Sequence, residues 1–172
     1  MSLLSSDRRA EVYEFSPILF WASLMVAVLL QGIVPVHFSF GQLFDLPLIL
    51  LIYYAANRSR KDFGILLGAG LGLFQDALVG GPFGMFGMAK SVVGYLAASI
   101  AIRVDMDRVS SRAIFSGALI LIHMLVLWFL NMALLEVQAS VGALYAGLTL
   151  FVNTSLSVVL FVLLDRFRKR VW

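Results

Sequence analysis

Six apolar runs fill most of this chain, and each is separated from the next by a short connecting segment. A helix that crosses a bilayer needs about 20 mostly apolar residues. Hydrophobic residues make up 61% of the 172 residues and charged residues 13%, whereas roughly a quarter of an average soluble domain is charged. The sequence therefore predicts an all-α integral membrane protein, with residues 1–172 forming a single transmembrane domain. The predicted spans are residues 17–36, 43–57, 63–79, 83–102, 113–135 and 141–164.

The second run is the shortest of the six. Its uncharged part, Leu46 to Ala56, lies between Asp45 and Arg58. At about 1.5 Å per residue it falls short of a hydrocarbon core of about 30 Å. Pro47 suits the first turn of a helix, where a missing N–H costs nothing. Three alternatives follow: the flanking charges snorkel to the interface, the bilayer thins, or the segment is half-inserted.

The basic residues decide between topologies. Twelve of the 13 fall into alternate connecting segments if the short run is a full span, and the remaining connections hold none. The positive-inside rule assigns those twelve to the cytoplasm. The pattern predicts a six-span helix bundle, with residues 1–16 and 165–172 as cytoplasmic tails. The twelve are Arg8, Arg9, Arg58, Arg60, Lys61, Arg103, Arg108, Arg112, Arg166, Arg168, Lys169 and Arg170.

The third run carries a regular row of glycines. Gly64, Gly68 and Gly72 repeat at four-residue spacing, and Asp76 continues the row. Residues four apart share one face of a helix. Small residues at this spacing let another helix approach closely, because van der Waals packing drives helix association in lipid. The row predicts either close packing against a helix of the same chain or a docking face for another protein.

The turn after this row brings the next run back antiparallel. Gly81, Pro82 and Gly84 form a short glycine-rich connection. Asp76 before it and Lys90 after it would then lie at similar depth, about 6 to 9 Å below the turn by helix rise. A charge inside the bilayer is costly unless paired. We therefore expect an Asp76–Lys90 ion pair, which either clips the hairpin together or forms an outward polar pocket or a partner's contact point.

Other chemistry is sparse. The chain has no cysteine and two histidines far apart, so no metal site is expected, and no nucleophile with a positioned base suggests catalysis. No cofactor is expected, and the basic residues are too dispersed for a nucleic-acid site. The scattered polar residues should form interhelical hydrogen bonds, with proton relay or ligation as the alternatives for His123. They are Gln31, His37, Asp45, His123, Asn131 and Asn153.

The middle of the chain resembles the rod shape-determining MreD family of bacteria. The stretch from "FDLPLILLIYY" through "GAGLGLFQDALVGGPFG" to "VVGYLA" carries the resemblance. It comprises an acid and proline at a helix entry, an aromatic pair, a glycine-rich helix ending near an acid, a glycine turn and a Gly-Tyr-Leu helix. The matching residues are Asp45, Pro47, Tyr53, Tyr54, Gly68, Gly72, Asp76, Gly81, Gly84, Gly94, Tyr95 and Leu96.

The resemblance implies a non-enzymatic component of the cell-elongation machinery in the bacterial inner membrane. Its expected direct partner is MreC, with MreB filaments, RodA and a class B penicillin-binding protein in the same complex and membrane lipids around it. The resemblance also implies a likeness to the substrate-binding S-components of energy-coupling-factor transporters. The alternative function is accordingly a small-molecule-binding transporter subunit, with Asp76 and Lys90 lining an outward pocket. A homo-oligomer stays open beside a single copy.

Overall fold

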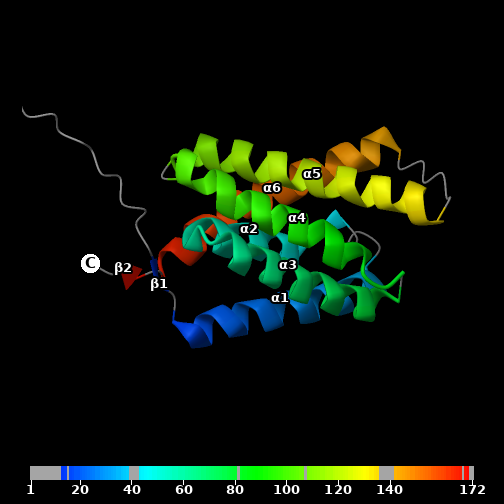
Figure 1. The fold of residues 1–172 in the computed structure, drawn as a ribbon, viewed down its shortest axis with the longest axis horizontal. Coiled ribbons are helices and arrows are strands. Elements are labelled where there is room, and N and C mark those ends of the chain that lie inside the picture. The colour runs from blue at the N-terminus through cyan, green and yellow to red at the C-terminus, as the bar shows by residue number, and fades with distance from the viewer. Residues whose placement is uncertain are drawn as a thin grey trace, which may run out of the picture.

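The computed structural model describes residues 13–14, 16–38, 43–80, 82–106, 108–135, 142–167 and 169–170 of the chain. Figure 1 shows six α-helices packed side by side, with a short two-stranded ribbon at one end. In chain order the elements are β1 (Tyr13–Glu14), α1 (Pro17–His37), α2 (Leu46–Arg58), α3 (Lys61–Val79), α4 (Met85–Ile100), the 3-10 helix η2 (Ala101–Arg103), α5 (Val109–Leu135), α6 (Ala143–Asp165) and β2 (Lys169–Arg170).

Five of the described helices are long and apolar enough to cross a membrane: α1, α3, α4 with η2, α5 and α6. The helix bounds differ from the predicted spans by at most four residues. The remaining helix, α2, has 13 residues and would be about 20 Å long. That α2 counts as a sixth full span stays a prediction.

The short helix α2 lies at the centre of the bundle. It contacts each of the other five α-helices, and every residue from Pro47 to Ala56 is buried. A helix that is apolar all round is a buried helix, and α2 is surrounded by protein. A helix in this position need not match the thickness of the hydrocarbon core, since lipid does not surround it. This burial explains how so short an apolar run belongs to the bundle.

The two ends of the described chain lie together. Strand β1 pairs antiparallel with β2, with Tyr13 opposite Arg170 and Glu14 opposite Lys169. Figure 1 shows this ribbon at one end of the bundle, where α1 begins and α6 ends. The chain therefore enters and leaves the bundle on the same side, as an even number of crossings requires. That this side faces the cytoplasm stays a prediction.

Charged side chains near this end link several helices. Arg112 of α5 forms an ion pair with Asp165 of α6, with Nη2 and Oδ2 2.5 Å apart. The Tyr53 hydroxyl of α2 donates to the other oxygen of Asp165, Oδ1, at 2.9 Å. The Arg58 guanidinium lies 4.5 Å from the centre of the Phe63 ring, a cation–π distance. The C-terminal half of α2 is thus held to its neighbours by polar and aromatic contacts.

Candidate functional site

The glycine row of α3 packs directly against α4. Gly64, Gly68 and Gly72 are all buried. A Cβ added to any of them would collide with a backbone carbonyl of α4, at Gly94, Lys90 and Phe86 respectively. The two backbones therefore approach each other as closely as small residues allow. This face of α3 is occupied by the chain's own α4, and no helix of another protein fits there.

Asp76, the last member of the row, caps the first turn of α4. Its carboxylate accepts backbone N–H bonds from Gly84 at 2.9 Å, Phe86 at 3.1 Å and Gly87 at 3.2 Å. The first N–H groups of a helix lack partners within the helix, and a negative charge there is favoured by the helix dipole. Asp76 therefore performs across the turn the role that a local N-cap side chain usually performs.

The turn between α3 and α4 depends on its glycines. Gly80 has φ of 70° and Gly84 has φ of 100°, a backbone region that glycine adopts without steric cost. Pro82 lies between them and is exposed. Gly81, also predicted as a site residue, lies outside the described residues. The turn returns the chain so that the N–H groups of α4 face the Asp76 carboxylate.

Removing the Asp76 carboxylate should loosen the hairpin. We expect Asp76→Ala to destabilise the protein by about 2 kcal/mol, because loss of an N-cap typically costs 0.5–2 kcal/mol. Asp76→Asn keeps one acceptor oxygen and should cost less. The melting temperatures of the purified variants measure both effects. If adding Lys90→Met restored the stability of Asp76→Ala, an interaction with Lys90 rather than capping would be the cause.

The predicted Asp76–Lys90 ion pair is wrong, because Lys90 binds a different carboxylate. Lys90 Nζ lies 2.6 Å from Asp45 Oδ1, and the Lys90 side chain is fully buried. The same oxygen of Asp45 accepts the N–H of Leu48 at 3.0 Å and so caps α2. Asp45 does not snorkel to an interface. Instead it joins the start of α2 to the second turn of α4, and the pair balances two charges inside the protein.

The backbone just before α2 is held by amide side chains from α1 and α6. Asn153 Nδ2 donates to the Leu43 carbonyl at 2.6 Å, and its Oδ1 accepts from the Asp45 N–H at 2.8 Å. Gln31 Nε2 donates to the Phe44 carbonyl at 2.8 Å. Asn153 is ten residues into α6, about 15 Å from its first residue. The non-helical segment thus lies deep, where only contacts with protein can satisfy it.

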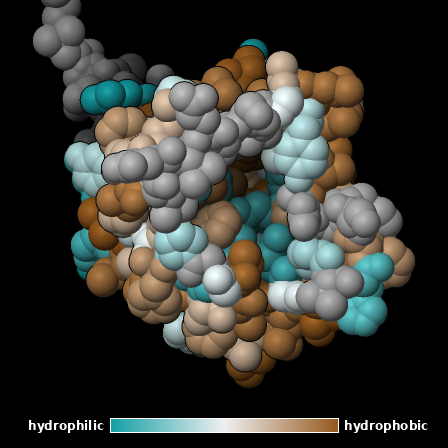
Figure 2. Space-filling view, turned by 90° about the vertical axis from the view of Figure 1, so that its right-hand side faces the viewer, coloured by the Kyte–Doolittle hydropathy of each residue, from teal (hydrophilic) through white to brown (hydrophobic). Residues whose placement is uncertain are grey.

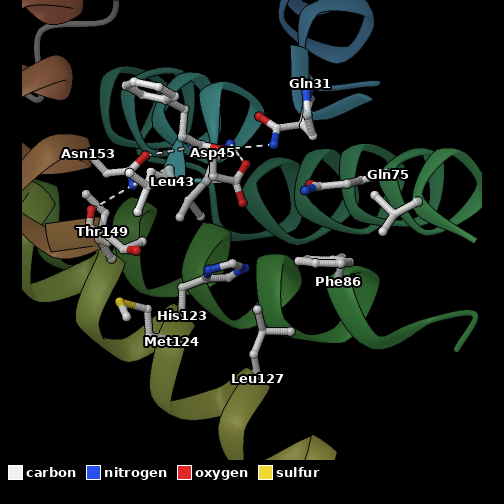
Figure 3. Close-up of a pocket in the computed structure, with 15 residues that line it drawn as sticks. Gln31, Leu43, Asp45, Gln75, Phe86, His123, Met124, Leu127, Thr149 and Asn153 are labelled. Carbon is white, nitrogen blue, oxygen red and sulfur yellow. Dashed lines mark hydrogen bonds between the residues drawn. The ribbon is translucent and has the colours of Figure 1, made fainter. Parts of the chain in front are cut away.

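A cavity of about 330 Å³ adjoins the start of α2. Figure 2 views the bundle end that bears the α3–α4 turn, and shows a hollow with hydrophilic residues at its base. Figure 3 shows side chains from several helices around this space. The cavity is lined by Gln31, Pro35, Leu43, Phe44, Asp45, Leu48, Gln75, Val79, Phe86, Ile120, His123, Met124, Leu127, Thr149 and Asn153.

The other polar side chains divide into two groups. His37 and Asn131 contact carbonyls of their own helices, at Ile33 and Leu127, so these two make no interhelical hydrogen bond there. His123 is also not the bonded residue we predicted: its buried Nε2 has no hydrogen-bond partner in the described part of the chain. Its ring instead stacks on Phe86, with centroids 6.3 Å apart. The prediction of an interhelical bond holds for Gln31, whose Oε1 accepts from the Leu46 N–H of α2 at 3.3 Å, whereas Asn153 binds the segment just before α2.

Two cavity residues, Gln75 and Thr149, have no place in the sequence prediction. Gln75 could have been noticed, because it is an amide inside an apolar helix and immediately precedes Asp76. Thr149 offers no comparable signal, since an isolated threonine is common in a membrane helix. Within the described ranges, no group of three or more His, Cys, Asp or Glu residues could hold a metal ion.

These observations define the class of the protein. It is a multi-pass helical membrane protein whose ionisable and amide side chains mainly hold its own helices together, around a cavity at one end. A family model described as rod shape-determining protein MreD matches residues 14–171, and the chain therefore belongs to this family. Membership implies a role in rod-shape determination, and the family is a shape-determining structural component rather than a known enzyme family. Comparisons with curated proteins and with solved structures give no match.

Proposed function

We propose that this protein is a non-enzymatic membrane scaffold of the bacterial cell-elongation machinery. In this role it binds MreC directly and helps couple MreB filaments to the peptidoglycan synthases, RodA and a class B penicillin-binding protein. The observation that carries the proposal is the family match, which spans all six helices. The use of Asp45, Asp76 and Lys90 in internal contacts also favours a structural role over a chemical one.

The proposed location is the inner membrane, with six spans and both termini in the cytoplasm. The alternation of connections with and without basic residues supports this orientation. The β1–β2 ribbon supports an even number of crossings, since it joins the two ends of the described chain. In this orientation the cavity and the α3–α4 turn face outward.

A partner helix would bind on a lipid-facing side of the bundle. The glycine face of α3 is filled by α4, so the docking role considered for that row does not apply. Large apolar side chains point outward instead on α1 and α6, where Trp21 is 64% and Phe151 71% exposed. Such surfaces can receive a single spanning helix by van der Waals packing.

Direct binding to MreC can be tested by capture and cross-linking in membranes. We expect the tagged protein to co-purify MreC from solubilised membranes. A photo-reactive residue placed at Trp21, Leu66, Leu125 or Phe151, one on each of four helices, should cross-link MreC from the side that binds it. The same residue at Ala97, which is fully buried, should give no cross-link. Absence of MreC from both experiments would count against the scaffold proposal.

The cavity supports a second candidate function, the binding of a small molecule by a transporter-like subunit. Its volume of about 330 Å³ lies at the lower end of the roughly 300–1,000 Å³ typical of small-molecule sites. Its wall is largely apolar with a few convergent polar groups, which is also typical of such sites. Asp45 and Gln75 line it in place of the predicted Asp76 and Lys90.

A further inference from the structure

The cavity gathers buried polar atoms that have no hydrogen-bond partner in the described part of the chain. Gln75 Oε1, His123 Nε2 and Thr149 Oγ1 are buried and have no hydrogen-bond partner among the described residues. They come from three helices, α3, α5 and α6, and all three residues line the cavity. Gln75 and His123 are each only 4% exposed. Buried polar groups in folded proteins normally have partners, so their convergence on one space points to a bound molecule.

The other two amide side chains of the cavity, Asn153 and Gln31, already have hydrogen-bond partners in the protein. Asn153 is bonded through both its Nδ2 and its Oδ1, and so is Gln31 through its Nε2 and Oε1. They fix the backbone around Leu43 and Leu46 and so shape the cavity. Figure 3 shows the Gln75 amide and the His123 ring extending toward Asp45 from different sides of the same space. The groups that position the site are therefore distinct from those that face a ligand.

The charges around the cavity select the kind of ligand. Lys90 is bound to Asp45, so its positive charge is balanced and does not attract an anion. Lys90 and Leu48 both donate their hydrogen bonds to the same oxygen of the Asp45 side chain, Oδ1. The acceptor oxygens of Asp45 and Gln75 would repel an anion. A hydroxyl or an amide N–H, in contrast, would donate a hydrogen bond to them.

We propose that this cavity binds a small uncharged organic molecule, which donates hydrogen bonds from one end and is apolar along the rest. Its hydroxyl or amide N–H groups contact Gln75, with His123 and Thr149 as further partners. Its apolar part packs against side chains such as Phe86, Met124 and Leu127. The inference rests on the second candidate function, ligand binding, and is separate from the scaffold role. It adds the chemical class of the ligand.

Reversible disulfide capture tests this class in the full-length protein. The chain has no cysteine, so Met124→Cys places a single thiol in the apolar wall and leaves every polar group in place. The probes are three aryl disulfides on one linker, carrying a hydroxymethyl, a methoxymethyl or a carboxylate group. Each competes with excess 2-mercaptoethanol, and intact-protein mass spectrometry measures the captured fraction. Leu125→Cys is the matched control, since this neighbouring residue of α5 is 54% exposed.

We expect Met124→Cys to capture the hydroxymethyl probe about fivefold more than either other probe, as one additional hydrogen bond would give. Adding Gln75→Leu should reduce this preference to less than about twofold, while Leu125→Cys should show no preference. Equal capture of all probes at both positions would overturn ligand binding itself. Enrichment at Met124→Cys without a preference for the hydroxymethyl probe, or with a preference for the carboxylate, would overturn only the proposed class. Leu127→Cys replaces Met124→Cys if that variant does not fold.

Discussion

Replacing Gly68 with leucine should prevent the bundle from assembling. The side chain would collide with the backbone of α4 at Lys90 and Ser91, and a backbone cannot move aside as a flexible side chain can. Overpacking typically costs about 1–3 kcal/mol and occasionally more, and we expect the upper end of this range or beyond. Little monodisperse protein should be recovered from membranes, and its melting temperature should fall sharply.

Gly70 provides the matched control on the same helix. It is exposed, and a Cβ at this position would have no atom of a neighbouring element within 4 Å. Gly70→Leu should leave the yield and the melting temperature unchanged or slightly higher, because leucine forms helix better than glycine by about 0.8 kcal/mol. If both variants lost stability equally, the close approach of α3 and α4 would not be the reason.

The second large loss of stability should come from removing either member of the Asp45–Lys90 ion pair. Lys90→Met leaves a carboxylate inside the protein without its cation, and Asp45→Asn leaves the buried ammonium without its anion. Removing one member of a buried ion pair costs about 3–5 kcal/mol. The double variant Asp45→Asn/Lys90→Met should recover most of that loss, because neither charge remains. Asn at position 45 can still cap Leu48.

A double-mutant cycle on melting temperature or resistance to denaturant measures this coupling. The parallel cycle with Asp76→Asn and Lys90→Met is the control, and it should give a much smaller coupling. A larger coupling for Asp76 than for Asp45 would contradict the ion pair seen in the structure. Additive losses in both cycles would show that neither carboxylate stabilises Lys90.

Much of the architecture follows from local sequence patterns. Apolar length located the long helices, and the four-residue glycine spacing correctly indicated a close helix contact. The spacing could not predict which helix makes this contact, because it describes one helix face and not what covers that face. The structure places α4 there, so that Gly94 and Gly64 meet backbone to backbone.

The partner of Lys90 could not be obtained in this way. A hairpin pattern relates only the groups on either side of one tight turn, and Asp76 is the acid in that position. Asp45 lies 45 residues before Lys90 and reaches it because α2 occupies the middle of the bundle. The lining of the cavity could not be predicted for a related reason: Gln75, His123 and Thr149 come from three helices, and no sequence period connects them.

The central position of α2 has a consequence for how the chain is made. Ribosomes deliver α2 before α4, so Asp45 reaches the membrane when Lys90 has not yet been synthesised. Until α4 arrives, the carboxylate has no counter-ion and the short apolar helix has few protein neighbours to shield it. The stable insertion of α2 therefore depends on α4, which is synthesised later and supplies the counter-ion and the protein contacts that α2 requires. Truncation after Val79 would leave α2 without that environment.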